Sequence, residues 1–144
     1  MNNTDLEKNI TRLVSELSDE KGYICSVDIL LGLNYLAKSD YEKWRNGQVG
    51  CLEEICQINL SKLSTISKII RQVATKMNLE PSLTVYTKFG KGPKRRLRFS
   101  KSGNSNIENA YSTHFINKYH FEKLKMNKKN LDSSTSGIQI DQQQ

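Results

Sequence analysis

The feature that most constrains the fold is a change of hydrophobic period at Pro81. In the segment 59–79, apolar residues recur every three or four positions, which predicts an amphipathic helix: Leu63, Ile66, Ile70, Val73 and Met77. Proline lacks an N–H group and disfavours helix in the preceding residue, so we expect the helix to end before it. Two alternating runs then flank the turn GKGPK at 90–94, a pattern typical of a β-hairpin.

The predicted hairpin has one apolar and one basic face. Because an isolated two-stranded hairpin is only marginally stable, we expect one face to dock on the helices. That face comprises Val85, Phe89, Leu97 and Phe99. The opposite face would present Tyr86, Lys88, Arg96 and Arg98 to solvent.

Short helices are predicted on both sides of this unit. Candidate helix starts are the capping boxes Thr4/Glu7, Ser39/Glu42 and Ser105/Glu108, together with Ser26 as an N-cap. Gly22 is a candidate helix stop. The predicted fold is mainly α with a C-terminal β-hairpin (α+β), winged-helix-like, in a single domain. It divides into an N-terminal amphipathic helix at 1–22, a winged-helix-like basic domain at 23–126 and a polar tail at 127–144, which we expect to be disordered.

Charge is segregated along the chain. Residues 1–60 carry six basic and ten acidic side chains, whereas residues 61–144 carry sixteen basic and five acidic ones. The segment 59–79 has four basic residues and no acid, and the segment 88–101 has seven basic residues and no acid. A basic working surface of this kind favours nucleic acid as the partner.

The order of a basic helix followed by a basic hairpin is the layout of a winged helix-turn-helix domain. There the last core helix enters the major groove and the hairpin wing follows the backbone, where Lys and Arg contact phosphates. Gln and Arg can form bidentate contacts with base edges. The predicted nucleic-acid-binding residues are Ser64, Lys68, Arg71, Gln72, Thr75, Tyr86, Lys88, Lys91, Lys94, Arg95, Arg96, Arg98 and Lys101.

The function predicted from this layout is non-catalytic binding of nucleic acid, with duplex DNA favoured over RNA. RNA stays open because an exposed Tyr86 beside Arg96 could stack on a base. A second alternative is docking of the basic surface on an acidic protein partner, in an assembly subunit or inhibitor. A third is a nuclear localisation signal at 91–98. A fourth is a small nuclease using His114 as general base, although a spacing of six would put His114 and His120 on opposite sides of one helix.

No cofactor, metal site or catalytic residue is predicted. Cys25, Cys51 and Cys56 lack the paired spacing of zinc ligands, so we expect free, mostly buried thiols. No apolar stretch approaches the roughly 20 residues of a membrane span. The polar and acidic start of the chain lacks a signal region, which favours a cytoplasmic location, or a nuclear one in a eukaryote.

Three short patterns resemble a group of small uncharacterised bacterial proteins. They are V-D-x-L-x-G at 27–32, N-L-S-K-x-S at 59–64 and R-F-S-K-S-G at 98–103. The resemblance covers about residues 22–117 and implies that this span forms a single domain. It implies no activity, cofactor or binding residue.

Overall fold

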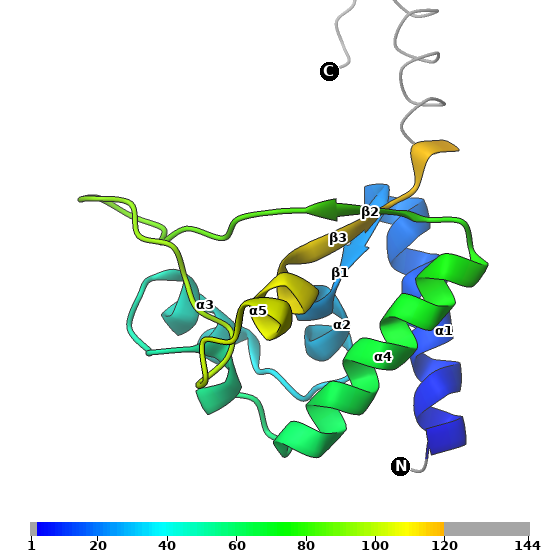
Figure 1. The fold of residues 1–144 in the computed structure, drawn as a ribbon, viewed down its shortest axis with the longest axis horizontal. Helices are drawn as coiled ribbons and strands as arrows, with labels where there is room; N and C mark the ends of the chain where they lie inside the picture. Colours follow the sequence, from blue (N-terminus) through cyan, green and yellow to red (C-terminus); the bar gives the residue numbers. More distant parts are fainter. Residues whose placement is uncertain (1–2, 120–144) are drawn as a thin grey trace, which may run out of the picture.

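The computed structural model describes residues 3–119, which form a mixed α+β fold (Figure 1). The elements are α1 (Asn3–Lys21), β1 (Tyr23–Cys25), α2 (Ser26–Gly32), α3 (Lys38–Arg45), the 3-10 helix η1 (Leu52–Glu54), α4 (Leu60–Lys76), β2 (Glu80–Leu83), α5 (Ser105–Ser112) and β3 (Thr113–Ile116). The predicted α+β class is confirmed. The predicted tail at 127–144 lies outside the described residues.

The three strands form one antiparallel sheet in the order β1-β3-β2. β3 lies in the centre, with Cys25 of β1 and Ser82 of β2 both opposite His114. Pro81 does not itself terminate α4, which ends at Lys76; it lies within β2 opposite Phe115. Since β2 pairs on one side only, it is an edge strand, where a residue without an N–H group is tolerated.

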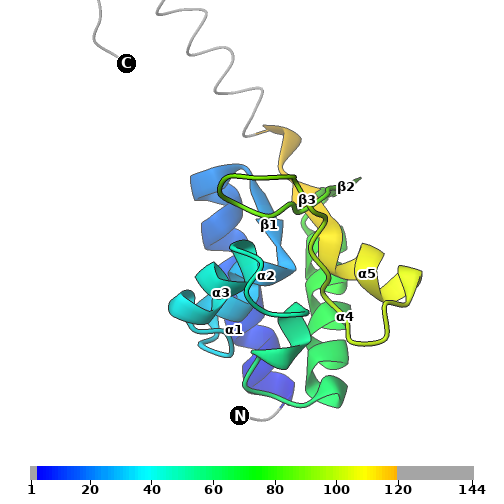
Figure 2. The ribbon, with the colours of Figure 1, turned by 90° about the vertical axis from the view of Figure 1, so that its left-hand side faces the viewer.

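The core lies between α1, α4 and the sheet (Figures 1 and 2). Leu6, Ile10 and Val14 of α1 are fully buried and belong to the same apolar cluster as Ile66 and Ile70 of α4. The N-terminal helix thus shares its core with the rest of the described chain. Among residues 3–119, no helix combines the length and the apolar character needed to cross a membrane.

The boundaries of α4 follow from the two asparagines that flank it. The Asn59 side chain accepts a hydrogen bond from the Lys62 backbone N–H at 2.8 Å, which caps the helix start. The helix ends at Lys76, and Asn78 then adopts a positive φ of 59°. The helix is therefore shorter than the predicted segment 59–79, because asparagine tolerates the left-handed conformation that reverses the chain here.

Most of the predicted helix caps are wrong in detail. Thr4 lies inside α1, Ser26 is the first residue of α2, and Ser39 lies inside α3, whose N-cap is Ala37. At α5, the neighbouring Asn104 side chain accepts the N–H groups of Asn106 and Ile107, in place of Ser105. Each capping pattern came within one or two residues of a real helix start. Gly22 is confirmed as a stop, with φ 84° and its N–H donating to the Ser18 carbonyl.

Candidate nucleic-acid interface

The basic run lies in a projecting segment that we call the basic arm, residues 84–99 (Figure 1). Its two halves pair through a single bridge between Thr87 and Arg96, flanked by hydrogen bonds from Lys88 N to Arg95 O (2.9 Å) and from Leu97 N to Tyr86 O (2.8 Å). At the tip, Gly90 and Gly92 have φ values of 95° and 98°, and a Cβ on either would meet no atom within 4 Å. The predicted hairpin is thus present only as a short paired arm with an unobstructed tip.

Trp44 of α3 holds the base of the arm. Its side chain is completely buried, and its indole N–H donates to the Arg98 carbonyl at 2.8 Å. The ring centroid lies 5.6 Å from that of Tyr86 and 5.0 Å from that of Phe99, so it contacts both halves of the arm. This packing supplies the docking surface that an isolated hairpin lacks.

Backbone hydrogen bonds from η1 also hold the second half of the arm. Leu52 N donates to Arg98 O and Glu53 N donates to Phe99 O, at 3.1 and 2.9 Å. The Glu108 carboxylate of α5 accepts the N–H groups of Phe99 and Ser100. Glu108 therefore orients the arm rather than closing a capping box with Ser105. The base of the arm is rigidly attached while its tip projects.

The two faces of the first half of the arm are opposite to those predicted. Tyr86 is 7% exposed, whereas Val85 and Phe89 are 56% and 48% exposed. In the second half Leu97 and Phe99 are buried as predicted. Because a shift of one residue moves every side chain of a strand to the other face, the alternation alone does not decide which set is inward. The buried hydroxyl of Tyr86 meets His114, which satisfies it inside the core.

The basic side chains of the arm have no acidic partner within residues 3–119. Those of Lys91, Lys94, Arg95, Arg96 and Arg98 are exposed, while Lys88 is half-buried. Their hydrogen bonds go to carbonyl oxygens, as in Arg95 Nη2 to Gly47 O (3.0 Å) and Arg98 Nη2 to Lys101 O (3.0 Å). These bonds orient the charges without neutralising them. The arm therefore offers net positive charge to a ligand.

The predicted residues of α4 all lie on its exposed side: Ser64, Lys68, Arg71, Gln72 and Thr75. Three of them, Ser64, Lys68 and Arg71, also line a groove of about 620 Å³ between α4 and α5, to which Lys101 contributes. Arg71 and Thr75 border a smaller hollow of about 280 Å³ toward β2 and β3. The structure thus brings Lys101 to the basic face of α4, but α5 flanks that face. Figure 1 shows the arm tip pointing away from α4.

Sequence reasoning missed Trp44 and Arg45. Trp44 had a signal, being the single tryptophan of the chain. Arg45 had no such signal in the sequence. In the structure its guanidinium lies 3.8 Å from the centroid of the Phe89 ring and donates to the Thr87 carbonyl at 3.2 Å. Arg45 therefore lies over the ring of Phe89, which is still 48% exposed to solvent.

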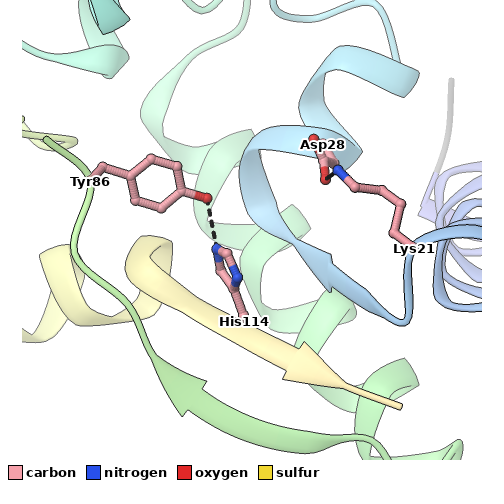
Figure 3. Close-up of polar contacts among 4 residues, drawn as sticks. All are labelled: Lys21, Asp28, Tyr86 and His114. Atoms are coloured by element: carbon pink, nitrogen blue, oxygen red, sulfur yellow. Dashed lines mark hydrogen bonds and ion pairs between the residues drawn. The ribbon is translucent and has the colours of Figure 1, made fainter. Parts of the chain in front are cut away.

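The predicted short helix from Ser105 through Tyr111 is confirmed as α5, and His114 follows it on β3, whereas His120 is outside the described residues. The His114 Nε2 is 2.9 Å from the Tyr86 hydroxyl (Figure 3). The imidazole ring also stacks on Tyr23, with centroids 4.9 Å apart. Burial lowers the pKa of His114 below 6.5, with Asp28 opposing and Lys21 reinforcing this shift. The imidazole is therefore neutral at pH 7.

The Cys25 thiol, near this cluster, is also neutral at pH 7, because burial raises its pKa to about 11. The three cysteines are free thiols, as predicted, with Cys25 and Cys51 buried and Cys56 half-buried. Among residues 3–119, no three side chains of His, Cys, Asp or Glu gather in a way that could hold a metal ion.

We expect the free energy of unfolding to decrease as the pH falls below about 6.5. The pKa of His114 is lower in the folded than in the unfolded chain, so the unfolded chain binds the proton more readily in this range. Urea denaturation between about pH 8 and pH 5 measures this slope. His114→Asn, which retains a polar partner for Tyr86, should flatten it. An identical slope in the variant would contradict the assignment to His114.

Two exposed basic surfaces are therefore present, the arm and the outer face of α4. Both derive from the acid-poor stretches that the sequence singled out. Comparison with protein-family models, with curated proteins and with solved structures finds no match to this chain.

Proposed function

We propose that the protein binds nucleic acid without catalysing a reaction, that duplex DNA is its main ligand, and that the basic arm is its main phosphate-binding element. The observation that carries this is the set of six basic residues of the arm, at 88–98, which have no acid among them and no ion pair within residues 3–119. Lys and Arg on a projecting backbone are suited to contact phosphates without reading sequence.

The order of elements supports a winged-helix-like arrangement. α4 leads directly into β2, and β2 pairs with β3, so the arm lies within the connection of two neighbouring antiparallel strands. A wing occupies this place in a winged helix-turn-helix domain. Two features depart from that layout: α3 and η1 intervene between α2 and α4, and α5 follows the arm before β3. We therefore regard the connection as an enlarged wing.

The burial of Tyr86 favours duplex DNA over single-stranded RNA. Tyr86 was the candidate stacking platform for an unpaired base, but its ring packs against Trp44 and Phe99. Phe89 is exposed, but the Arg45 guanidinium lies over its ring. Because Tyr86 is buried and Arg45 lies over the Phe89 ring, we regard phosphate contact as the interaction that the arm supports best.

Titration of a fluorescently labelled duplex with the full chain, at about 50 and 200 mM salt, tests the proposal. If four to six phosphates are contacted, the slope of log K against log salt should be about −4 to −5. A dissociation constant weaker than about 10⁻⁴ M at the lower salt would refute the proposal, because even non-specific binders reach about 10⁻⁴ to 10⁻⁶ M.

Gln72 is the residue of α4 best placed to read a base. It is exposed and, unlike Lys68 and Arg71, does not line the groove beside α5. We expect Gln72→Ala to weaken binding to a preferred duplex by about 1–3 kcal/mol and to leave binding to unrelated duplexes unchanged. Selection from a random duplex library by the wild-type and variant proteins measures this. Equal enrichment of the same sequences by both would exclude a reading role for Gln72.

A further inference from the structure

The groove between α4 and α5 is built from two facing helical stripes. On α4 the lining residues are Leu60, Leu63, Ser64, Ser67, Lys68 and Arg71, and on α5 they are Asn106, Ile107, Ala110 and Tyr111. The α4 stripe advances in steps of three and one, and so follows one side of that helix for three turns, about 16 Å. Small residues on both helices, Ser64 and Ser67 of α4 and Ala110 of α5, leave room between the helix axes.

Four large apolar side chains are among the residues that line this groove. Leu63 and Tyr111 are 3% and 6% exposed and form the floor. Leu60 and Ile107, on opposite sides, are 56% and 41% exposed, although both are large apolar side chains. A ligand that covered them would remove this apolar area from water, which is favourable. The ligand should therefore carry an apolar stripe of its own.

The charge around the groove is positive. Lys68, Arg71 and Lys101 line it, and Glu53 is the single acid among its lining residues. The Glu53 carboxylate is already engaged, since it accepts the Lys101 backbone N–H at 2.9 Å and the Tyr111 hydroxyl at 3.2 Å. The three cations have no ion pair within residues 3–119. An apolar ligand with acidic flanks would complement this arrangement.

The groove is also preformed. Besides the Tyr111–Glu53 bond, the Glu108 carboxylate holds α5 to the backbone of Phe99 and Ser100, and the Phe99 and Tyr111 rings stack with centroids 5.2 Å apart. Because α5 is fixed in this way, a partner would not have to order it on binding.

We propose that this groove binds an acidic amphipathic helix of a partner protein. A helix fits this groove in three respects. Apolar residues of the partner helix at positions i, i+3, i+4 and i+7 would follow the apolar floor, and three turns of it would span the lining residues of α4. Asp or Glu beside those apolar residues would meet the three cations of the groove. The proposal goes beyond nucleic-acid binding and is independent of the arm tip, because Lys91, Lys94, Arg95 and Arg96 do not line the groove.

The test uses displayed random peptides of about 15 residues, selected on the full chain after depletion on the variant Leu60→Glu/Ile107→Glu. Both positions are exposed, so the variant should fold, and circular dichroism checks this. We expect the enriched peptides to share an apolar i, i+3, i+4, i+7 pattern with acidic flanks. A synthetic copy should bind the wild type and lose about tenfold or more in affinity to Ile107→Glu and to Lys68→Glu. Lys8→Glu, an equal charge change on α1, should not alter binding.

Four outcomes would overturn the proposal. The first is no enrichment over the depleted pool. The second is enrichment of basic or non-periodic peptides. The third is a concentration-dependent dimer of the wild type that Ile107→Glu abolishes, which would assign the groove to a second copy of the chain. The fourth is loss of duplex binding on Ile107→Glu, with folding intact, which would assign it to nucleic acid.

Discussion

Replacing Trp44 with alanine should lower the free energy of unfolding by about 3–5 kcal/mol, the range found for large aromatic side chains removed from a core. Trp44 is completely buried, its ring packs against Tyr86 and Phe99, and its N–H donates to the Arg98 carbonyl. The substitution removes all of these contacts and leaves a cavity under the arm. Urea denaturation followed by circular dichroism measures the loss.

Two further variants make this prediction specific. Trp44→Phe keeps most of the ring but loses the N–H, and the Arg98 carbonyl still accepts from Leu52 N at 3.1 Å, so we expect a loss of about 1–2 kcal/mol. Val85→Ala, in the arm but 56% exposed, should change stability by less than about 0.5 kcal/mol. If Val85→Ala lowered the free energy of unfolding as much as Trp44→Ala, this would contradict the exposure of Val85 and the burial of Tyr86 in the arm.

Removing the charges of the arm tip should abolish most binding to duplex DNA. We expect replacement of Lys91, Lys94, Arg95 and Arg96 by glutamine to reduce affinity about 10²- to 10³-fold at about 0.1 M salt and to make the salt slope shallower by about 3 to 4. The loss should be the same for every duplex sequence, since phosphate contacts carry no base information. Titrations at several salt concentrations measure both quantities.

The matched control removes the same number of charges from the other half of the chain. Lys8, Arg12, Lys38 and Lys43 have exposed side chains on α1 and α3, and their replacement by glutamine lowers the net charge equally. If the effect depends only on net charge, both quadruple variants will lose affinity alike, and the arm will have no special role. Normal binding by the control alone would locate the phosphate contacts on the arm.

Local patterns predicted the helices well because each depends on neighbours within a turn. The stripe from Leu63 to Val73 in α4 is buried as its period required. The sheet was harder, because β2 pairs with a strand thirty residues further along the chain. Its sequence EPSL has no alternating apolar residues, and the structure leaves it largely exposed at the edge of the sheet. Only the tertiary partner, β3, makes this segment a strand.

The candidate site shows the same difference between features that depend on neighbouring residues and features that depend on residues far apart in the sequence. The exposed residues of α4 could be predicted, since the face opposite a buried stripe must meet solvent. The groove between α4 and α5 could not be predicted from the sequence. The position of α5 depends on the Glu108 carboxylate, which accepts hydrogen bonds from the backbone of Phe99 and Ser100. In the arm, the inward choice of Tyr86 over Val85 depends on Trp44 and His114, which lie far from it in the sequence.

The anchored base of the arm has a consequence for the entropy of binding. Fixing the backbone of one residue costs about 1–2 kcal/mol, and any ligand must meet this cost for each residue that it orders. Bonds from Trp44, Leu52, Glu53 and Glu108 already hold residues 98–100 in the free protein. The turn around Gly90 and Gly92 stands clear of the core, since a Cβ on either glycine would meet no atom within 4 Å. A ligand that grips the tip therefore immobilises a few residues, although the connection that carries them runs from residue 84 to residue 112.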